Sequence, residues 1–198
     1  QADEKAKRDK YLSISQEQLQ RLSGLVEQIL TMSMEQRKTF RLRPEEITLA
    51  TLLESLTEQH KLKAQNPIDI DYRVEPANLT VFADRTHFSN ILSNLIDNAV
   101  KSGGSKVDVS GRLISHSIYR IAVSDNGRGI PPEDIERITE AFYMVDKSRS
   151  RSEHGAGLGL ALVSRIAKLH DTKIHYESES GKGTKVYFDM KAEALDEK

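Results

Sequence analysis

Cysteine and tryptophan are absent from the 198-residue sequence, and only 11 glycines and five prolines occur in it. Without cysteine the chain can form no disulfide, no thiolate nucleophile and no Cys-ligated zinc site, which fits a reducing compartment. No apolar run approaches the roughly 18 residues that a membrane span needs, and no signal-peptide pattern opens the chain. We therefore expect a soluble piece of protein.

Charge of either sign is not in excess. The chain has 29 basic and 30 acidic side chains and a net charge of −1, so its bulk charge gives no reason to expect nucleic-acid binding. With 37% hydrophobic residues, the length suffices for one domain of ordinary size plus roughly 40 to 50 further residues. The chain starts with Gln1, and we expect it to be a portion of a longer protein.

The first 40 residues have a heptad pattern. Its positions step alternately by three and four residues: Leu12, Ser15, Leu19, Leu22, Val26, Ile29 and Ser33. One interpretation is a single amphipathic helix that lies on its own domain. We favour the other, a helix that pairs in a dimer, because Leu25, Leu30, Met32 and Met34 add apolar surface. The boundary predicted from this pattern gives segments 1–39 and 40–198, with Pro44 ending the connector.

Beyond the connector, helical and strand-like patterns are intermixed. Helices are expected over 48–66 with Thr48 as the cap, over 85–101 with Asp84 as the cap, briefly after Pro131, and after Gly157. Strands are expected over 68–74, 79–82, 105–115, 117–125, 172–180 and 184–190, with a loop over 143–155. Adjacent strands without intervening helices predict an α+β fold, a two-layer sandwich of one mixed sheet and one layer of about three helices, preceded by a long N-terminal helix.

Three polar motifs follow one another along this part of the chain. Asn94, Asn98 and Lys101 share one stripe of a helix, where amide oxygens suit Mg²⁺ and a lysine suits a phosphate; alone, the stripe could be a solvated face. Asp125 ends a strand before Gly127 and Gly129, and could accept a hydrogen bond from an exocyclic amino group, although such a sequence is often only a turn.

The third motif supplies a site for an anion. Glycines 155, 157 and 159 precede an amphipathic helix, whose free first-turn N–H groups can face a phosphate. Glycine also serves close helix packing, so this motif is weak alone. We expect Gly157→Ala or Gly159→Ala to reduce ligand affinity more than fold stability.

In this order the motifs resemble the catalytic and ATP-binding domain of bacterial sensor histidine kinases, which shares its Bergerat-type nucleotide fold with gyrase, Hsp90 and MutL. The resemblance spans about residues 41–190. It implies an N box with Asn98 as the main Mg²⁺ ligand, assisted by Asn94, and with Lys101 near the phosphates. It also implies that Asp125 recognises adenine and that residues 143–156 form an ATP lid. The remaining implied nucleotide-binding residues are Gly127, Gly129, Ile130, Phe142, Arg149, Gly155, Gly157, Leu158, Gly159, Leu160 and Thr184, with Gly181 and Gly183 beside Thr184 in the last box.

The resemblance implies an enzyme that transfers the γ-phosphoryl group of Mg-ATP to a histidine, for relay to an aspartate of a response regulator. The N-terminal heptads resemble the second helix of the dimerisation and phosphotransfer domain. None of the six histidines has the phosphoacceptor context, so the acceptor is expected on a helix absent from this chain. The implied partners are phosphotransfer helices of the same or a partner subunit, a receiver domain and a second subunit. The implied location is the cytoplasmic part of a membrane-bound sensor.

Three residues depart from the family pattern. Ser102 follows Lys101 where an aromatic residue is common, and Met144 stands where arginine is frequent, which leaves Arg149 and Arg151 as lid cations. His170-Asp171 replaces a frequent His-Gly, which should affect only a turn. His154 of the lid could contact the phosphates, and the other histidines are interpreted as structural or surface residues.

Two other functions remain open from sequence. An ATPase of the gyrase, Hsp90 or MutL kind has a glutamate at the position of Asn94 to activate water, and an amide cannot take that proton. A protein-serine kinase or a degenerate nucleotide-binding scaffold could use the same fold. Asn94 thus disfavours the ATPase, and the intact motifs and the heptads favour a dimeric histidine kinase over the second alternative.

Overall fold

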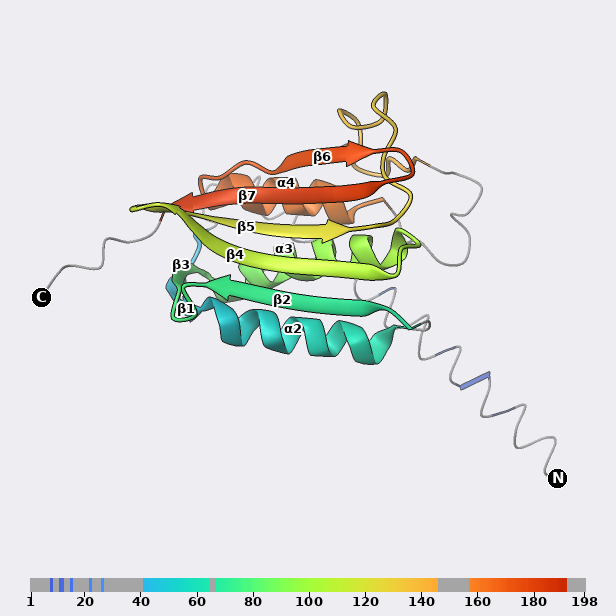
Figure 1. The fold of residues 1–198 in the computed structure, drawn as a ribbon. Helices are drawn as coiled ribbons and strands as arrows, with labels where there is room; N and C mark the ends of the chain where they lie inside the picture. The colour runs from blue at the N-terminus through green and yellow to red at the C-terminus, as the bar shows by residue number, and fades with distance from the viewer. Residues whose placement is uncertain are drawn as a thin grey trace, which may run out of the picture. The chain divides into compact units, whose positions relative to one another are not determined.

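The computed structural model describes residues 41–64, 67–145 and 157–191, together with isolated residues of the N-terminal segment (Figure 1). The chain divides into two compact units, Gln1–Phe40 and Arg41–Lys198. In the first unit, the described heptad positions Leu12, Ser15, Leu22 and Val26 are helical. Leu19, Ile29 and Ser33 lie outside the described residues.

The second unit contains a five-stranded mixed sheet. In spatial order its strands are β2 (Asp69–Glu75), β4 (Lys106–Ser115), β5 (Ile118–Asp125), β7 (Gly183–Lys191) and β6 (His175–Glu179). The β2–β4 pair is parallel and the other three pairs are antiparallel. β1 (Pro44–Thr48) and β3 (Thr80–Asp84) form a separate antiparallel pair. The mixed sheet predicted from the intermixed pattern is therefore confirmed.

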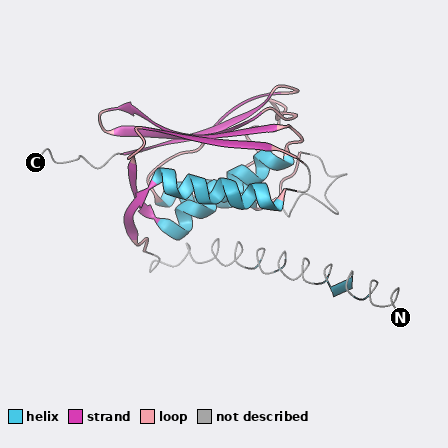
Figure 2. Ribbon diagram, turned by 60° about the horizontal axis from the view of Figure 1, so that its bottom comes forward, coloured by secondary structure: helices cyan, strands magenta, loops and turns pink. Residues whose placement is uncertain are grey.

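Helices α2 (Leu49–Lys63), α3 (Arg85–Lys101) and α4 (Gly159–Leu169) cover one face of this sheet (Figure 2). The strands bury alternate residues against them, as a sheet with one covered face requires. Val107 and Val109 of β4, and Tyr119 and Ile121 of β5, are 0–1% exposed. Phe88 of α3 meets Phe188 of β7 edge to face, with ring centroids 6.2 Å apart. The two-layer α+β fold is thus confirmed for the part of the chain that the structure describes.

Three details differ from the sequence expectation. No helix forms after Pro131; residues 132–139 are turns, in which Asp134, Ile135 and Arg137 donate to carbonyls three residues earlier. Within these residues Ile138 alone donates to the fourth preceding carbonyl, that of Asp134, so the bonding pattern of an α-helix is not established. α2 ends at Lys63 rather than residue 66, and the Thr48 side chain makes no capping hydrogen bond. Strand β1 was not predicted.

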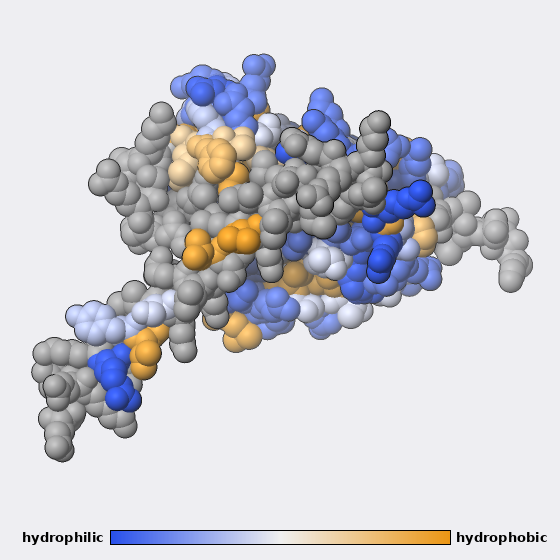
Figure 3. All heavy atoms as spheres, turned by 180° about the vertical axis from the view of Figure 1, so that it is seen from behind, coloured by the Kyte–Doolittle hydropathy of each residue, from blue (hydrophilic) through white to orange (hydrophobic). Residues whose placement is uncertain are grey.

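Figure 3 shows the molecule from the side opposite to that of Figure 1. Among the described residues on this face, hydrophobic side chains form small areas that hydrophilic side chains separate. Within the described residues, no helix is both long and apolar enough to span a membrane.

Candidate functional site

The polar stripe predicted on one helix lies on α3. Asn94 is half-buried and its amide group donates to the Asn90 carbonyl at 2.8 Å. Its side-chain oxygen is directed at the start of α4, because a Cβ added to Gly159 would lie 2.8 Å from it. Asn98 and Lys101 are exposed further along α3. The stripe thus starts beside α4 and runs to the carboxyl end of α3.

Asp125 ends β5 beside the carboxyl end of α3. Its carboxylate accepts hydrogen bonds from the Gly127 amide at 2.8 Å, from the Ser102 hydroxyl and from the Thr184 amide. Burial nevertheless raises the pKa of Asp125 above its usual value of 3.8. Glycine is required at 127, since a Cβ there would lie 1.9 Å from the Ser102 hydroxyl oxygen. The turn therefore holds one half-buried carboxylate in a fixed position.

Side chains from β6 and β7 fix the other side of this turn. The Ser178 hydroxyl accepts from the Ile130 amide at 2.8 Å and donates to the Gly183 carbonyl at 3.0 Å. It also lies 2.9 Å from the Thr184 hydroxyl. Gly129 has a φ of +69°, and a Cβ there would lie 2.1 Å from the Glu179 carbonyl oxygen. Ser178 thus connects the predicted residues Ile130 and Thr184, and Gly129 lies against the backbone of Glu179 beside them.

The start of α4 forms the other end of the candidate site. Gly157 has a φ of +71° and its carbonyl accepts from the Phe142 amide at 2.9 Å. Leu158 is 2% exposed and precedes the first helical residue, Gly159. The first-turn amides of α4, including that of Leu160, lack intrahelical partners and can face an anion. Phe142 also has a positive φ, 67°, and its side chain is 69% exposed.

The predicted residues lie in two groups, one at each end of the candidate site. Asp125, Gly127, Gly129, Ile130 and Thr184 form one end. At the other end Asn94 meets Gly159, and Gly157 packs against Phe142 and Tyr143 just before it. Arg149, Arg151, His154, Gly155 and most of the predicted lid lie outside the described residues.

Sequence reasoning missed three supporting residues. Ser102 and Ser178 contact the turn from elements that are distant in sequence. Asn126 accepts from the Ser105 and Lys106 amides at 2.9 Å. Asn126 could have been suspected from the frequent use of asparagine in turns. Ser102 was noted only as a departure from an aromatic residue, and no sequence signal marked Ser178.

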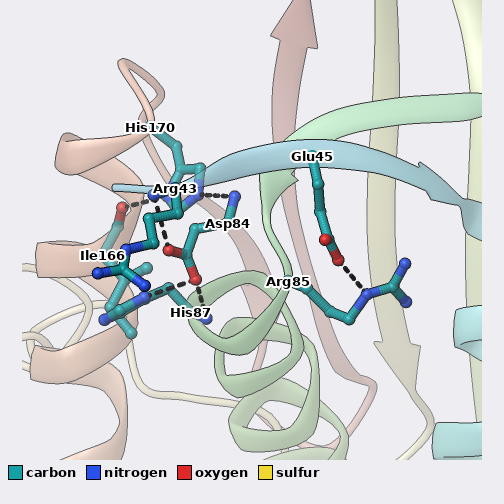
Figure 4. Close-up of polar contacts among 7 residues, drawn as sticks. All are labelled: Arg43, Glu45, Asp84, Arg85, His87, Ile166 and His170. Carbon is teal, nitrogen blue, oxygen red and sulfur yellow. Dashed lines mark hydrogen bonds and ion pairs between the residues drawn. The ribbon is translucent and has the colours of Figure 1, made fainter. Parts of the chain in front are cut away.

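A buried polar network connects the start of α3 to the end of α4 (Figure 4). Asp84 accepts from the Arg43 amide at 3.0 Å, and from the amide and ring of His87 at 3.2 and 2.8 Å. Burial alone would raise the pKa of Asp84, but these hydrogen bonds lower it from 3.8 to about 2. The Asp84 amide donates to Nε2 of His170, whose Nδ1 contacts the Ile166 carbonyl at 3.0 Å.

His170 is thus a structural residue of this network, one of the two roles that the sequence interpretation left open for it. Nε2 can accept this bond only without a proton, so the neutral ring fits the network, and burial lowers the pKa of His170. Asp171 has a φ of 53°, which is the conformation that the frequent glycine would adopt without strain.

The donors of the candidate site fit a magnesium ion only together with a ligand. No cluster of three or more His, Cys, Asp or Glu side chains that could hold a metal occurs among the described residues. Asn94 has an amide oxygen directed at the first residue of α4, and Asn98 has an exposed amide. Mg²⁺ commonly takes few protein oxygens and completes its shell with water and phosphate oxygens. These asparagines fit that mode of binding and not an all-protein cage.

Comparisons with known proteins identify the family of this chain. The sensor-like histidine kinase SenX3 of Mycobacterium bovis is 38% identical over 167 residues, which cover 83% of this chain and 40% of that protein. This chain thus spans well under half the length of that relative. Among solved structures, full-length ShkA in complex with AMPPNP has a TM-score of 0.75 at 29% identity, covering 87% of this chain and 36% of that one.

The catalytic domain of the histidine kinase ThkA has a TM-score of 0.63 at 26% identity, covering 76% of this chain and 96% of that one. The family described as histidine kinase-, DNA gyrase B-, and HSP90-like ATPase matches residues 83–194. This match covers more than half of the chain and includes both ends of the candidate site. The chain therefore belongs to the family of histidine kinase-, DNA gyrase B- and HSP90-like ATPases.

Proposed function

We propose that this chain is the ATP-binding catalytic portion of a sensor protein-histidine kinase. The observation that carries the proposal is Asn94, an amide rather than a carboxylate, whose oxygen is directed at the first residue of α4. The opposite end of the site holds the Asp125 carboxylate beside Ser102 and Thr184. A nucleotide could thus be held by its base at one end and by its phosphates at the other.

In this proposal the base lies at Asp125. The carboxylate accepts a hydrogen bond from the exocyclic amino group of adenine, and Gly127 and Gly129 leave room for the ring. The phosphates lie at the first-turn amides of α4, where the helix N-terminus favours negative charge, and Lys101 supplies a cation. Phosphoryl transfer depends mainly on such positioning and charge neutralisation.

Asn94 and Asn98 would hold Mg²⁺ through their amide oxygens. Bound there with the phosphates, the ion would neutralise their negative charge. Arg149 and the lid over 143–156 remain proposals, because most of that segment lies outside the described residues.

An ATP-hydrolysing enzyme is the alternative within the same family. Hydrolysis needs a base that takes a proton from water, and the amide of Asn94 cannot act as one near neutral pH. Asn94 therefore favours transfer to a separate nucleophile. We propose that this nucleophile is a histidine on a phosphotransfer helix of the same or a partner subunit, and that a receiver-domain aspartate accepts the group next. The sensor's cytoplasmic part would be the site of both steps.

Binding is tested by calorimetric titration of the chain with AMPPNP, with and without Mg²⁺. We expect Asp125→Asn or Asn98→Ala to weaken Mg-AMPPNP binding about tenfold or more, since each removes a contact that involves a charge. Asp108→Asn is the control, because Asp108 is exposed on β4 and pairs with Lys106 at 3.0 Å. Equal affinities for all three variants would contradict the site.

Transfer is tested with labelled ATP and a separate polypeptide that contains a phosphotransfer helix with its histidine. The expected product is acid-labile phosphate on that histidine. Rapid release of phosphate in the absence of the acceptor polypeptide would instead identify a hydrolase and overturn the kinase proposal.

A further inference from the structure

The helices leave one face of the five-stranded sheet uncovered (Figure 1). A cationic groove lies on the strands of this sheet. It has a volume of about 300 Å³, and its lining includes Arg73, Ser110, Arg112, Arg120, Ser124 and Lys185. These residues come from four neighbouring strands, β2, β4, β5 and β7. The groove faces away from α3 and α4, so it is distinct from the candidate nucleotide site.

The strand register explains why the face is hollow here. Ser110 of β4 and Ala122 of β5 lie directly opposite each other, and Arg73 of β2 lies opposite Ser110. Ala122 points away from the core, because its neighbours Ile121 and Val123 are buried against the helices. Even so, Ala122 is only 6% exposed. Small side chains therefore form the floor, and longer side chains surround them.

The fold pairs only some of the positive charges on the rim of the groove. Arg112 and Arg120 lie directly opposite each other on β4 and β5, an arrangement of like charges that is destabilising in a sheet. Asp189 binds Arg120 through two hydrogen bonds of 2.7 and 2.8 Å, and Glu177 binds Lys185 at 3.1 Å.

Two cations of the rim are available to bind a ligand. Within the described residues, Arg73 and Arg112 form no ion pair, and Glu75 is the one carboxylate of the lining. Glu75 lies opposite Arg112 across the β2–β4 pair. The lining therefore has an excess of positive charge, concentrated on two guanidinium groups with free donors.

We propose that the cationic groove binds a small phosphate-bearing anion. Guanidinium groups match pairs of phosphate oxygens with two parallel N–H donors, and the hydroxyls of Ser110 and Ser124 offer further donors at the floor. The volume lies at the low end for small-molecule sites, and the raised rim suits a small ligand better than a flat protein surface. The like-charged pair, unfavourable for the fold alone, becomes favourable when an anion lies between its members.

The test is a ¹⁵N NMR titration of the full chain with inorganic pyrophosphate at low salt and without Mg²⁺. We expect shifts of the Ser110, Ala122 and Ser124 amides. Arg73→Ala or Arg112→Ala should weaken binding about tenfold or more, as expected for loss of a charged donor. The control is Lys61→Ala on α2, which removes an exposed cation paired with Glu58 and should change the affinity less than twofold.

A second readout separates binding from folding. The melting temperature of Arg112→Ala should stay close to that of the unchanged chain, because the relieved repulsion from Arg120 and the lost attraction to Glu75 oppose each other. A clearly lower melting temperature would make Arg112 a structural residue and overturn the proposal. So would shifts confined to the Gly127 and Gly159 amides, or equal affinities of the Arg112→Ala and Lys61→Ala variants. Tighter binding of a hexaglutamate peptide at the same amides would assign the groove to an acidic protein segment and likewise overturn it.

Discussion

Ser102 shows at the scale of one residue what sequence reasoning could and could not predict. Its position after Lys101 suggested only the loss of an aromatic stacking contact. In the structure its hydroxyl donates to Asp125 and fills the space that a Cβ at Gly127 would need. Asp125 and Gly127 were predictable because they are neighbours in one turn, whereas Ser102 approaches from another element. Local contacts can be anticipated from spacing, and tertiary contacts of small polar residues cannot.

Gly157 and Gly159 were expected to behave alike, and the structure separates them. At Gly157 the φ of +71° strains any other residue, and a Cβ would lie 2.7 Å from the Tyr143 carbonyl oxygen. Gly157→Ala should therefore lower the free energy of unfolding by about 1–2 kcal/mol or more. At Gly159 a Cβ would meet only the side-chain oxygen of Asn94, at 2.8 Å. Gly159→Ala should change stability by about 1 kcal/mol or less and displace Asn94, weakening Mg-AMPPNP binding.

Urea denaturation and calorimetric titration of both variants check this prediction. Gly181→Ala is the matched control for the backbone effect, because Gly181 has a φ of +80° and open space around it. It should lose less stability than Gly157→Ala. If Gly159→Ala unfolds as readily as Gly157→Ala, the predicted difference between the two glycines is wrong.

At the scale of an element, the start of α3 was the easiest part to predict. The Asp84 side chain accepts from the His87 amide, as expected of a helix N-cap. The sequence did not indicate that the same carboxylate would also bind the Arg43 amide and the His87 ring. By contrast, the helix expected after Pro131 does not form. Helix period alone could not reveal that the amides of this short segment bond mostly to carbonyls three residues earlier, as in turns.

Asp84→Asn tests how much this helix start depends on charge. The pKa of Asp84 is about 2 in the folded protein against 3.8 ordinarily. The charged form therefore stabilises the fold fully above about pH 4, and this contribution is lost as the pH falls through the folded value. Because asparagine remains a good cap, the variant should lose mainly the charge effect, about 2 kcal/mol at pH 7.

Urea denaturation at pH 7, 5 and 3 measures this contribution. The stability difference between the unchanged chain and Asp84→Asn should narrow at pH 3. Glu45→Gln is the control, because Glu45 forms an exposed ion pair with Arg85 near the same helix start (Figure 4). It should cost about 1 kcal/mol or less. A difference that stays constant from pH 7 to pH 3 would contradict the charge effect.

At the scale of the whole molecule, the fold class was predictable and the strand order was not. Hairpins such as β6–β7 follow from turn residues between two strand patterns. The parallel β2–β4 pair joins strands separated by β3 and α3, and no local pattern specifies such a pairing. That pairing places α3 against the sheet between α2 and α4, where Asn94 meets Gly159. The motifs were recognisable from sequence, but their meeting depends on this long-range topology.

The segment 41–198 should fold by itself into a cooperative unit. Every residue of the buried hydrophobic core described in the structure lies between Ile47 and Met190, and the chain divides after Phe40. A unit that contains its own core is expected to unfold in one transition. Circular dichroism should therefore show one sigmoidal thermal transition for 41–198, coincident in the far and near ultraviolet, and Mg-AMPPNP should raise its midpoint if our proposed site is correct. A broad transition without near-ultraviolet signal would show that this segment needs residues outside it to pack its core. A sharp transition that Mg-AMPPNP leaves unchanged would support the fold and contradict the nucleotide site.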